Sequence, residues 1–197
     1  EGKMTPLQLG NVKARLRMIY LYNLASIHKG CVLDTDNKTE HELGFWTIHG
    51  DVGDLNCGLI YLWKTEVYEL AEYLLRELSI EYPKESKYSS KERDIIYSKY
   101  EAIQASIHLI PTDGNGVMSG GDCAQFGLDN YEQVDDVLKT MYFPEDGMDN
   151  IKYKEEYIRL IDSYNEQGVD KVMSLHQSSK FKRQPSPIYP TKDKLGL

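Results

Sequence analysis

Apolar residues recur at helical spacing along most of this chain. The spacing predicts helices over residues 11–29, 62–79, 95–108, 130–141 and 150–178. Gly30 is expected to end the first helix, and Gly168 is expected to interrupt the last. The first helix is apolar on nearly every side, which is typical of a helix buried inside a larger structure.

One segment, residues 31–33, has the apolar pattern of a strand. A lone strand leaves its backbone groups without ladder partners, so we expect further sheet, either upstream in the intact protein or in weaker segments. The polar residues 35–40 follow this strand directly. A short buried strand that runs into hydroxyls and carboxylates is typical of a site at the carboxyl edge of a parallel sheet.

Three segments have the composition of connections or surface structure. Residues 80–94 are rich in Lys, Glu and Ser around Pro83, which predicts a surface insertion. Residues 111–122 carry five glycines or prolines and are expected to form a loop. Residues 185–197 hold three prolines and are expected to form an extended tail.

The composition fits one domain or part of one. The 197 residues are 41% hydrophobic, enough for a core, and the net charge of -8 argues against nucleic acid or an anionic membrane as partner. Three scattered cysteines favour a reducing compartment. No apolar run approaches the roughly 18 residues of a membrane span and no segment resembles a signal peptide, so we expect a cytoplasmic location.

Several sequence blocks carry a resemblance to a known family. They are residues 11–18 (NVKARLRM), 35–40 (TDNKTE), 44–51 (GFWTIHGD), 111–113 (PTD), 128–138 (LDNYEQVDDVL) and 181–185 (FKRQP). In this order they resemble the ammonia-dependent NAD synthetases, a family of ATP pyrophosphatases, over about residues 9–187.

The resemblance implies a fold and a reaction. The fold is α/β, a doubly wound Rossmann-like parallel sheet of the adenine-nucleotide hydrolase type, to which this chain contributes mostly helices and few strands. Members of the family work as homodimers. They join ammonia to deamido-NAD at the cost of ATP, through an adenylated intermediate, and release AMP and pyrophosphate. The resemblance therefore implies a single synthetase domain over residues 1–197, incomplete at its N-terminus, with ATP and Mg²⁺ as cofactors.

On the nucleotide side, the resemblance implies contacts to ATP from Thr35, Lys64 and Thr112. Lys64 would be the catalytic cation, because it would stabilise charge that develops on the leaving pyrophosphate. Glu40 would hold magnesium, a hard ion that prefers oxygen ligands, with Asp51 or Asp54 as a second carboxylate. On the other side of the site, the positions that match deamido-NAD contacts are Arg15, Asp54, Phe181 and Lys182.

The chain also departs from the family pattern. The family's S-G-G-x-D-S phosphate loop lies upstream of the matched region, and Ser119-Gly120-Gly121-Asp122 lacks both its spacer residue and a preceding apolar strand. Ile48 stands where the family often has Lys, and Phe181 where it has His. Two alternatives therefore stay open: a non-catalytic ligand-binding or dimerising fragment, and the synthetase domain of a glutamine-dependent enzyme.

The nucleotide-side residues also have structural interpretations. Thr35 or Asp36 could cap a helix, with Glu40 completing a capping box. Lys64 could be a surface lysine paired with a nearby acid. The pair Asp135 and Asp136 is expected on the surface of its helix rather than in the catalytic site.

The basic candidates have similar alternatives. Arg15 and Arg17 could lie on a solvated helix face, and because they stand two residues apart, at most one is expected to face a ligand. Lys182 and Arg183 could belong to a basic tail.

Overall fold

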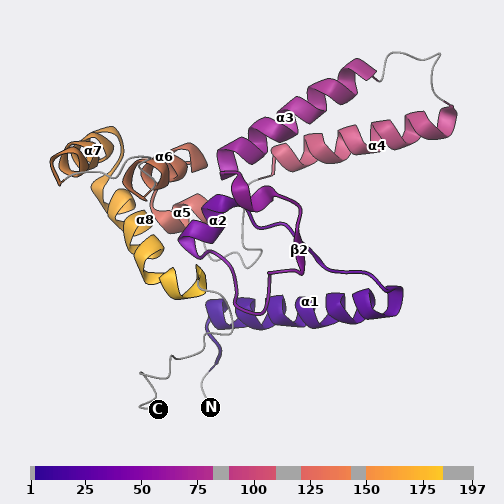
Figure 1. Cartoon of the computed structure of the whole chain (residues 1–197), viewed down its shortest axis with the longest axis horizontal. Helices are drawn as coiled ribbons and strands as arrows, with labels where there is room; N and C mark the ends of the chain where they lie inside the picture. Colours follow the sequence, from indigo (N-terminus) through magenta and orange to yellow (C-terminus); the bar gives the residue numbers. More distant parts are fainter. Residues whose placement is uncertain (1–2, 82–88, 110–120, 143–149, 184–197) are drawn as a thin grey trace, which may run out of the picture.

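The computed structural model describes residues 3–81, 89–109, 121–142 and 150–183, and helices dominate them (Figure 1). The α-helices are α1 (Pro6–His28), α2 (Lys38–Leu43), α3 (Lys64–Glu81), α4 (Ser90–Ile107), α5 (Gly121–Phe126), α6 (Tyr131–Tyr142), α7 (Asn150–Ser163) and α8 (Glu166–Ser178). The shorter elements are the strands β1 (Leu33–Asp34) and β2 (Leu55–Asn56) and the 3-10 helices η1 (Leu59–Tyr61) and η2 (Lys180–Arg183).

Helix α1 lies along one side of the molecule (Figure 1). It starts earlier than predicted because Thr5 caps it in a capping box with Gln8, and it ends at Lys29, which takes the left-handed C-cap conformation (φ 52°). Within this chain α1 is not buried, since Ala14 is the one residue of the helix that is buried. In this chain, the partner of α1 is the polar segment of residues 47–54, which covers only one of its faces.

The sheet consists of two short parallel strands, in which Leu33 pairs with Leu55. The first strand is shifted by two residues from the predicted segment 31–33, and the second comes from a segment whose pattern did not indicate a strand. Gly53 allows the two backbones to approach, because a Cβ atom there would stand 2.7 Å from the carbonyl oxygen of Val32.

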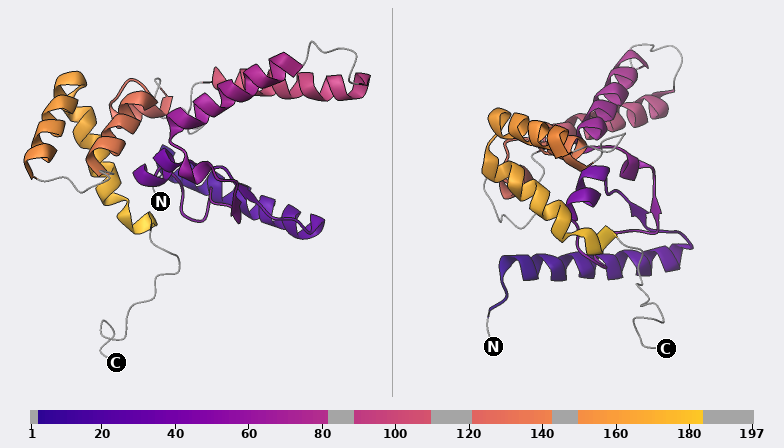
Figure 2. Two further views of the ribbon diagram at one scale, coloured as in Figure 1. Left: turned by 45° about the horizontal axis from the view of Figure 1, so that its top comes forward. Right: turned by 60° about the vertical axis from the view of Figure 1, so that its left-hand side comes forward.

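The apolar core lies among α5, α6 and α8, with α7 and α3 packed against α6. Its fully buried members are Phe126, Val134, Val137, Leu138, Leu160, Val169 and Val172. From this core, α8 runs toward α1 and ends in η2 (Figure 2). Helix α8 thus brings the C-terminal segment close to the N-terminal half of the chain.

Helices α3 and α4 pack along each other and project from the rest of the molecule (Figures 1 and 2). Helix α4 begins five residues before its predicted start, because Ser89 and Glu92 form a capping box. The predicted insertion 80–94 therefore includes the end of α3 and the start of α4, while residues 82–88 lie outside the described residues.

The predicted interruption at Gly168 is also wrong. The chain breaks at residues 164–165, and Asn165 caps α8 by accepting a hydrogen bond from the Gly168 amide at 2.7 Å. Gly168 instead provides a close helix contact, since a Cβ atom there would lie 2.4 Å from the carbonyl oxygen of Gly127. Within the predicted loop 111–122, residues 121–122 start α5, and the remainder lies outside the described residues, as does the tail 185–197.

Candidate functional site at the carboxyl end of β1

The first group of candidate residues lies where β1 ends and α2 begins. Thr35 follows β1 and is exposed. The residue that caps α2 is Asn37, so the interpretation of Thr35 or Asp36 as the cap is wrong. The Asn37 side chain accepts from the Glu40 amide at 3.0 Å, and the Glu40 carboxylate accepts from the Asn37 amide at 3.0 Å. This capping box fixes the Glu40 side chain at the N-terminal turn of α2.

Lys64, the first residue of α3, faces Glu40 across the site. Its Nζ atom lies 3.0 Å from Oε1 of Glu40, and the two side chains are 18% and 21% exposed. The same ammonium lies 5.4 Å from the ring centroid of Tyr131 on α6. The structure therefore brings the predicted catalytic cation, Lys64, into direct contact with the predicted magnesium ligand, Glu40. The alternative interpretation of Lys64, as a lysine paired with a nearby acid, predicts the same contact.

A buried carboxylate lies behind this pair. Asp135 is 1% exposed, so the expectation that it lies on the surface is wrong. One of its oxygens accepts from the Thr39 hydroxyl, and the other accepts from the Thr65 amide at 3.0 Å. Asp135 follows Tyr131 by four residues and precedes Leu138 by three, so its place on the apolar face of α6 was readable from the helical period.

Asp36 is a second residue to which the sequence assigned no binding role. Burial and the neighbouring carboxylates of Asp34 and Glu40 raise its pKa from 3.8 to about 7. A carboxyl group held beside other acids gains affinity for a cation. Among the described residues, no group of three or more His, Cys, Asp or Glu side chains is arranged to hold a metal ion. Mg²⁺ commonly takes one or two protein carboxylates and completes its shell with water and phosphate oxygens, so Glu40 and Asp36 fit this ion.

The second group of candidates lies along α1. The Arg15 guanidinium donates to the backbone carbonyl of Ile48 at 3.2 Å, and Arg17 lies 3.9 Å from Asp51. Both arginines thus contact residues 48–51, although they stand two positions apart on α1. Asp54 accepts from the Tyr22 hydroxyl at 2.9 Å, and this hydrogen bond raises the pKa of Tyr22.

The predicted site residues near the C-terminus lie close to the segment that follows α2. Lys182 Nζ donates to the carbonyl oxygens of Gly44 at 2.6 Å and Trp46 at 2.5 Å, and burial lowers the pKa of this lysine. Lys182 is therefore packed within the fold rather than part of a basic tail. Phe181 is 57% exposed, so its ring is available for contact. Thr112 lies outside the described residues.

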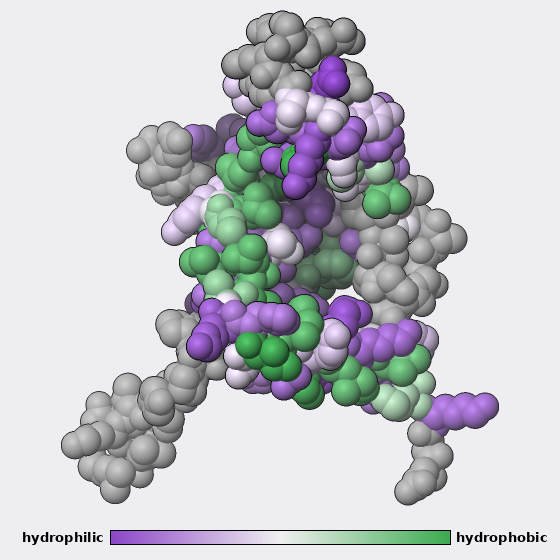
Figure 3. Space-filling model, turned by 90° about the vertical axis from the view of Figure 1, so that its right-hand side faces the viewer, coloured by the Kyte–Doolittle hydropathy of each residue, from purple (hydrophilic) through white to green (hydrophobic). Residues whose placement is uncertain are grey.

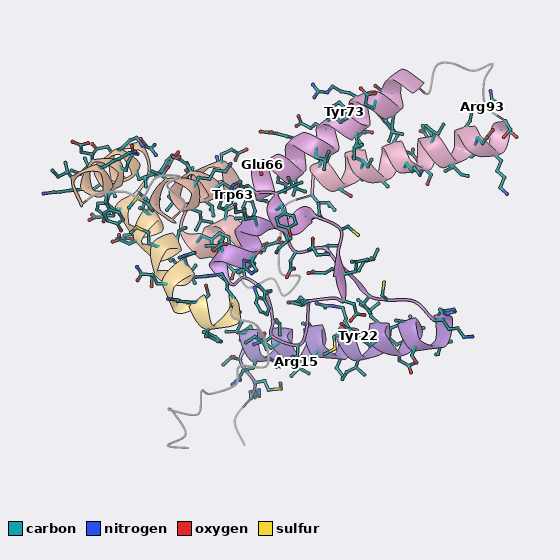
Figure 4. The ribbon with its side chains drawn as sticks, in the orientation of Figure 1. Arg15, Tyr22, Trp63, Glu66, Tyr73 and Arg93 are labelled. Carbon is teal, nitrogen blue, oxygen red and sulfur yellow. The ribbon has the colours of Figure 1, made fainter. Side chains whose placement is uncertain are left out.

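The candidate residues come from two sides of a hollowed surface. Figure 3 shows the hollow, with hydrophilic residues at its base and hydrophobic residues along one side. Trp63 and Glu66 stand at the start of α3, whereas Arg15 and Tyr22 come from α1 (Figure 4). A separate pocket of about 440 Å³ lies between α3 and α4, with Lys64 and Tyr68 in its lining.

Comparison with known proteins shows which family the chain is similar to. Residues 1–85 match the family model described as NAD synthase. The NH(3)-dependent NAD(+) synthetase of Methanopyrus kandleri is 30% identical over 177 residues, which are 90% of this chain. The chain is therefore similar to the NAD synthases, as its sequence blocks predicted.

A second curated relative shows the same similarity, and a solved structure shows a similar fold. The NH(3)-dependent NAD(+) synthetase of Thermoplasma volcanium is 44% identical over 66 residues, or 34% of this chain. A structure of NMN synthetase from Francisella tularensis superposes with a TM-score of 0.62 at 22% identity, covering 96% of this chain and 58% of that one. This likeness confirms the expected Rossmann-type fold.

The chain spans about half the length, or less, of these curated relatives. It covers 52% of the Methanopyrus kandleri protein and 27% of the Thermoplasma volcanium protein. Within the described residues, no helix combines the length and apolar character needed to cross a membrane.

Proposed function

We propose that this chain is the part of an ammonia-dependent NAD synthetase that positions ATP, Mg²⁺ and deamido-NAD, and that it acts in the cytoplasm. The single observation that carries the proposal is the Lys64–Glu40 pair, 3.0 Å apart at the starts of two helices beside the end of β1. The names of the curated relatives support ammonia as the nitrogen donor.

The reaction needs positioning and charge stabilisation rather than a protein nucleophile. The carboxylate of deamido-NAD attacks the α-phosphorus of ATP, the bond to the β-phosphate oxygen breaks, and pyrophosphate leaves. Ammonia then attacks the adenylated carbonyl carbon, loses a proton, and AMP departs with the carboxyl oxygen. Lys64 would stabilise the negative charge on the leaving pyrophosphate, and Thr35 and Thr112 would contact the nucleotide.

The metal would sit on the acidic side of this pair. Glu40 and Asp36 would hold Mg²⁺, which supplies positive charge to the phosphate oxygens when it is bound. Lys64, which pairs with Glu40 in this structure, would contact the phosphate oxygens of ATP.

Deamido-NAD would lie along α1 and the loop of residues 44–54. Arg15 offers a forked donor for a phosphate or carboxylate, Phe181 an exposed ring, and Lys182 and Asp54 shape the loop. The exposed apolar residues of α1 support a homodimer; they include Leu7, Leu16, Ile19, Tyr20, Leu21 and Ile27.

Calorimetry and product analysis test this function on the chain itself. ATP–Mg²⁺ and deamido-NAD are titrated separately, and AMP and NAD are then measured by chromatography after mixing with ammonium. Glu40→Gln is expected to abolish AMP formation, whereas Glu72→Gln, on an exposed turn of α3, keeps the wild-type behaviour. Normal AMP formation by Glu40→Gln would remove the magnesium role.

The coverage of about half of a relative favours one alternative, a ligand-binding or dimerising fragment without turnover. The same experiment separates the two functions. Binding of both ligands without AMP or NAD would establish the fragment, and product formation would exclude it.

A further inference from the structure

We propose that Asp135 is a positioning residue for this site, which together with Thr39 fixes the first turn of α3 so that Lys64 faces Glu40. The role of Lys64 toward ATP rests on the proposed function, but the positioning itself does not. Nothing in the family resemblance assigns a role to Asp135, which lies 96 residues from Thr39 in the sequence.

The geometry links both halves of the pair to one buried carboxylate. Thr39 precedes Glu40, and its hydroxyl donates to Asp135 while accepting from the Lys64 amide at 2.8 Å. Thr65 follows Lys64, and its amide donates to the second Asp135 oxygen at 3.0 Å. The residue next to each member of the ion pair is therefore held by the same side chain.

These bonds supply acceptors that the start of α3 needs. The first amides of a helix have no partner within the helix and must find acceptors elsewhere. The Lys64 and Thr65 amides take theirs from Thr39 and Asp135, on two other helices. A purely apolar contact would hold α6 against α3 without setting the rotation of its first turn. The hydrogen bonds set that rotation, and with it the direction of the Lys64 side chain.

The neighbouring residue Asp136 provides a matched control. Its carboxylate binds Arg159 at 3.1 Å and the Tyr164 hydroxyl at 2.8 Å, and these contacts join α6 to α7 and to the residue after it. Removing the charge at Asp136 or at Asp135 should lower stability in both cases. Only the change at Asp135 should alter the direction of the Lys64 side chain.

The test measures how fast an amine-reactive acetylating reagent modifies Lys64, by mass spectrometry of the whole chain, with exposed Lys171 as internal reference. Asp135→Asn leaves no acceptor for one of its two donors, so the Lys64 rate is expected to increase several-fold. Thr39→Val is expected to do the same, while Thr39→Ser, which keeps the hydroxyl, keeps the wild-type rate. Asp136→Asn should lower the melting temperature without changing the Lys64 rate.

ATP–Mg²⁺ affinity gives a second readout. Asp135→Asn and Thr39→Val are expected to weaken it on the order of 10-fold, the effect of one lost buried hydrogen bond. A wild-type acetylation rate of Lys64 in these two variants would overturn the proposal. An equal increase of that rate in Asp136→Asn would also overturn it. If Asp135→Asn does not fold, the Thr39→Val and Thr39→Ser pair decides the question. If the wild-type chain binds no ATP, the nucleotide role fails, and the acetylation rates still decide the positioning.

Discussion

At the scale of single residues, Asp36 shows how neighbouring acids change a side chain. Its carboxyl group keeps a proton up to a pKa of about 7 in the folded chain, against an ordinary value of 3.8. The folded state therefore binds this proton more tightly than the unfolded state does. The resulting contribution to stability is complete below about pH 4 and is lost as the pH rises through 7.

Asp36→Asn should therefore stabilise the chain more as the pH rises from 4 to 7, and by a constant amount above that. We expect about 2 kcal/mol at pH 8, after allowing for partial exposure to solvent. Urea unfolding at several pH values measures the difference, with exposed Asp162→Asn as control. A difference that does not change with pH would contradict the shifted pKa of Asp36.

Gly168 has little space for a side chain where α8 meets the turn after α5. Gly168→Ala would place a Cβ atom against the Gly127 carbonyl oxygen and the Leu128 side chain, and the backbone cannot easily move. We expect a loss of about 1–3 kcal/mol in the free energy of unfolding. Gly30→Ala, which meets nothing within 4 Å, is the matched control and should change stability by less than about 0.5 kcal/mol.

At the scale of elements, the helical period predicted the long helices but neither where each one ends nor the two six-residue helices α2 and α5. The break between α7 and α8 follows from the Asn165 cap, and the early start of α4 from the Ser89 box. Both signals are local hydrogen bonds that periodicity ignores. The strand β2 has only two residues, so no pattern of period two can reveal it.

The candidate site was also predictable only in part, because sequence patterns do not show which side chains the fold brings together. The resemblance named Glu40 and Lys64, and the structure brings them together. It gave no signal for Asp36, whose pKa depends on neighbours brought close by the fold. The helical period of α6 did carry a signal for Asp135, since the residue falls on the apolar face between Val134 and Leu138.

Arg183 joins η2 to α2, and its removal should loosen that junction. Its guanidinium donates to the carbonyl oxygens of Glu42 at 2.6 Å and His176 at 2.7 Å. Arg183→Gln should lower stability by about 1–2 kcal/mol and speed amide hydrogen exchange over residues 176–183. Lys180→Gln, on an exposed side chain of the same element, should leave both unchanged.

At the scale of the whole molecule, α1 presents apolar side chains to the solvent on the side away from its loop. Ile19, 61% exposed, and Tyr20, 62% exposed, belong to this surface. Single exposed apolar residues are ordinary, but a helix that exposes them along its length marks an association surface. The proposed homodimer would cover it.

Ile19→Glu should therefore shift the chain toward monomer, because a buried charge without a partner is costly at an interface. Sedimentation equilibrium at several protein concentrations measures the shift, and we expect the dimer dissociation constant to rise at least 10-fold. Gln104→Glu adds the same charge at an exposed position of α4, away from this surface, and is the control. A wild-type chain that is monomeric at all concentrations would refute the homodimer.

The contacts that hold α2 also determine when its surroundings can form during synthesis. The Thr39 hydroxyl binds a carboxylate 96 residues later, and the Glu42 carbonyl accepts from a side chain 141 residues later. At ordinary rates of translation, roughly 7–30 s separate the synthesis of Glu42 from that of Arg183. Thr39 and Glu42 are therefore synthesised long before these two distant partners exist. A nascent chain stalled before α6 would contain Glu40 and Lys64 in its sequence but would lack the carboxylate that orients them.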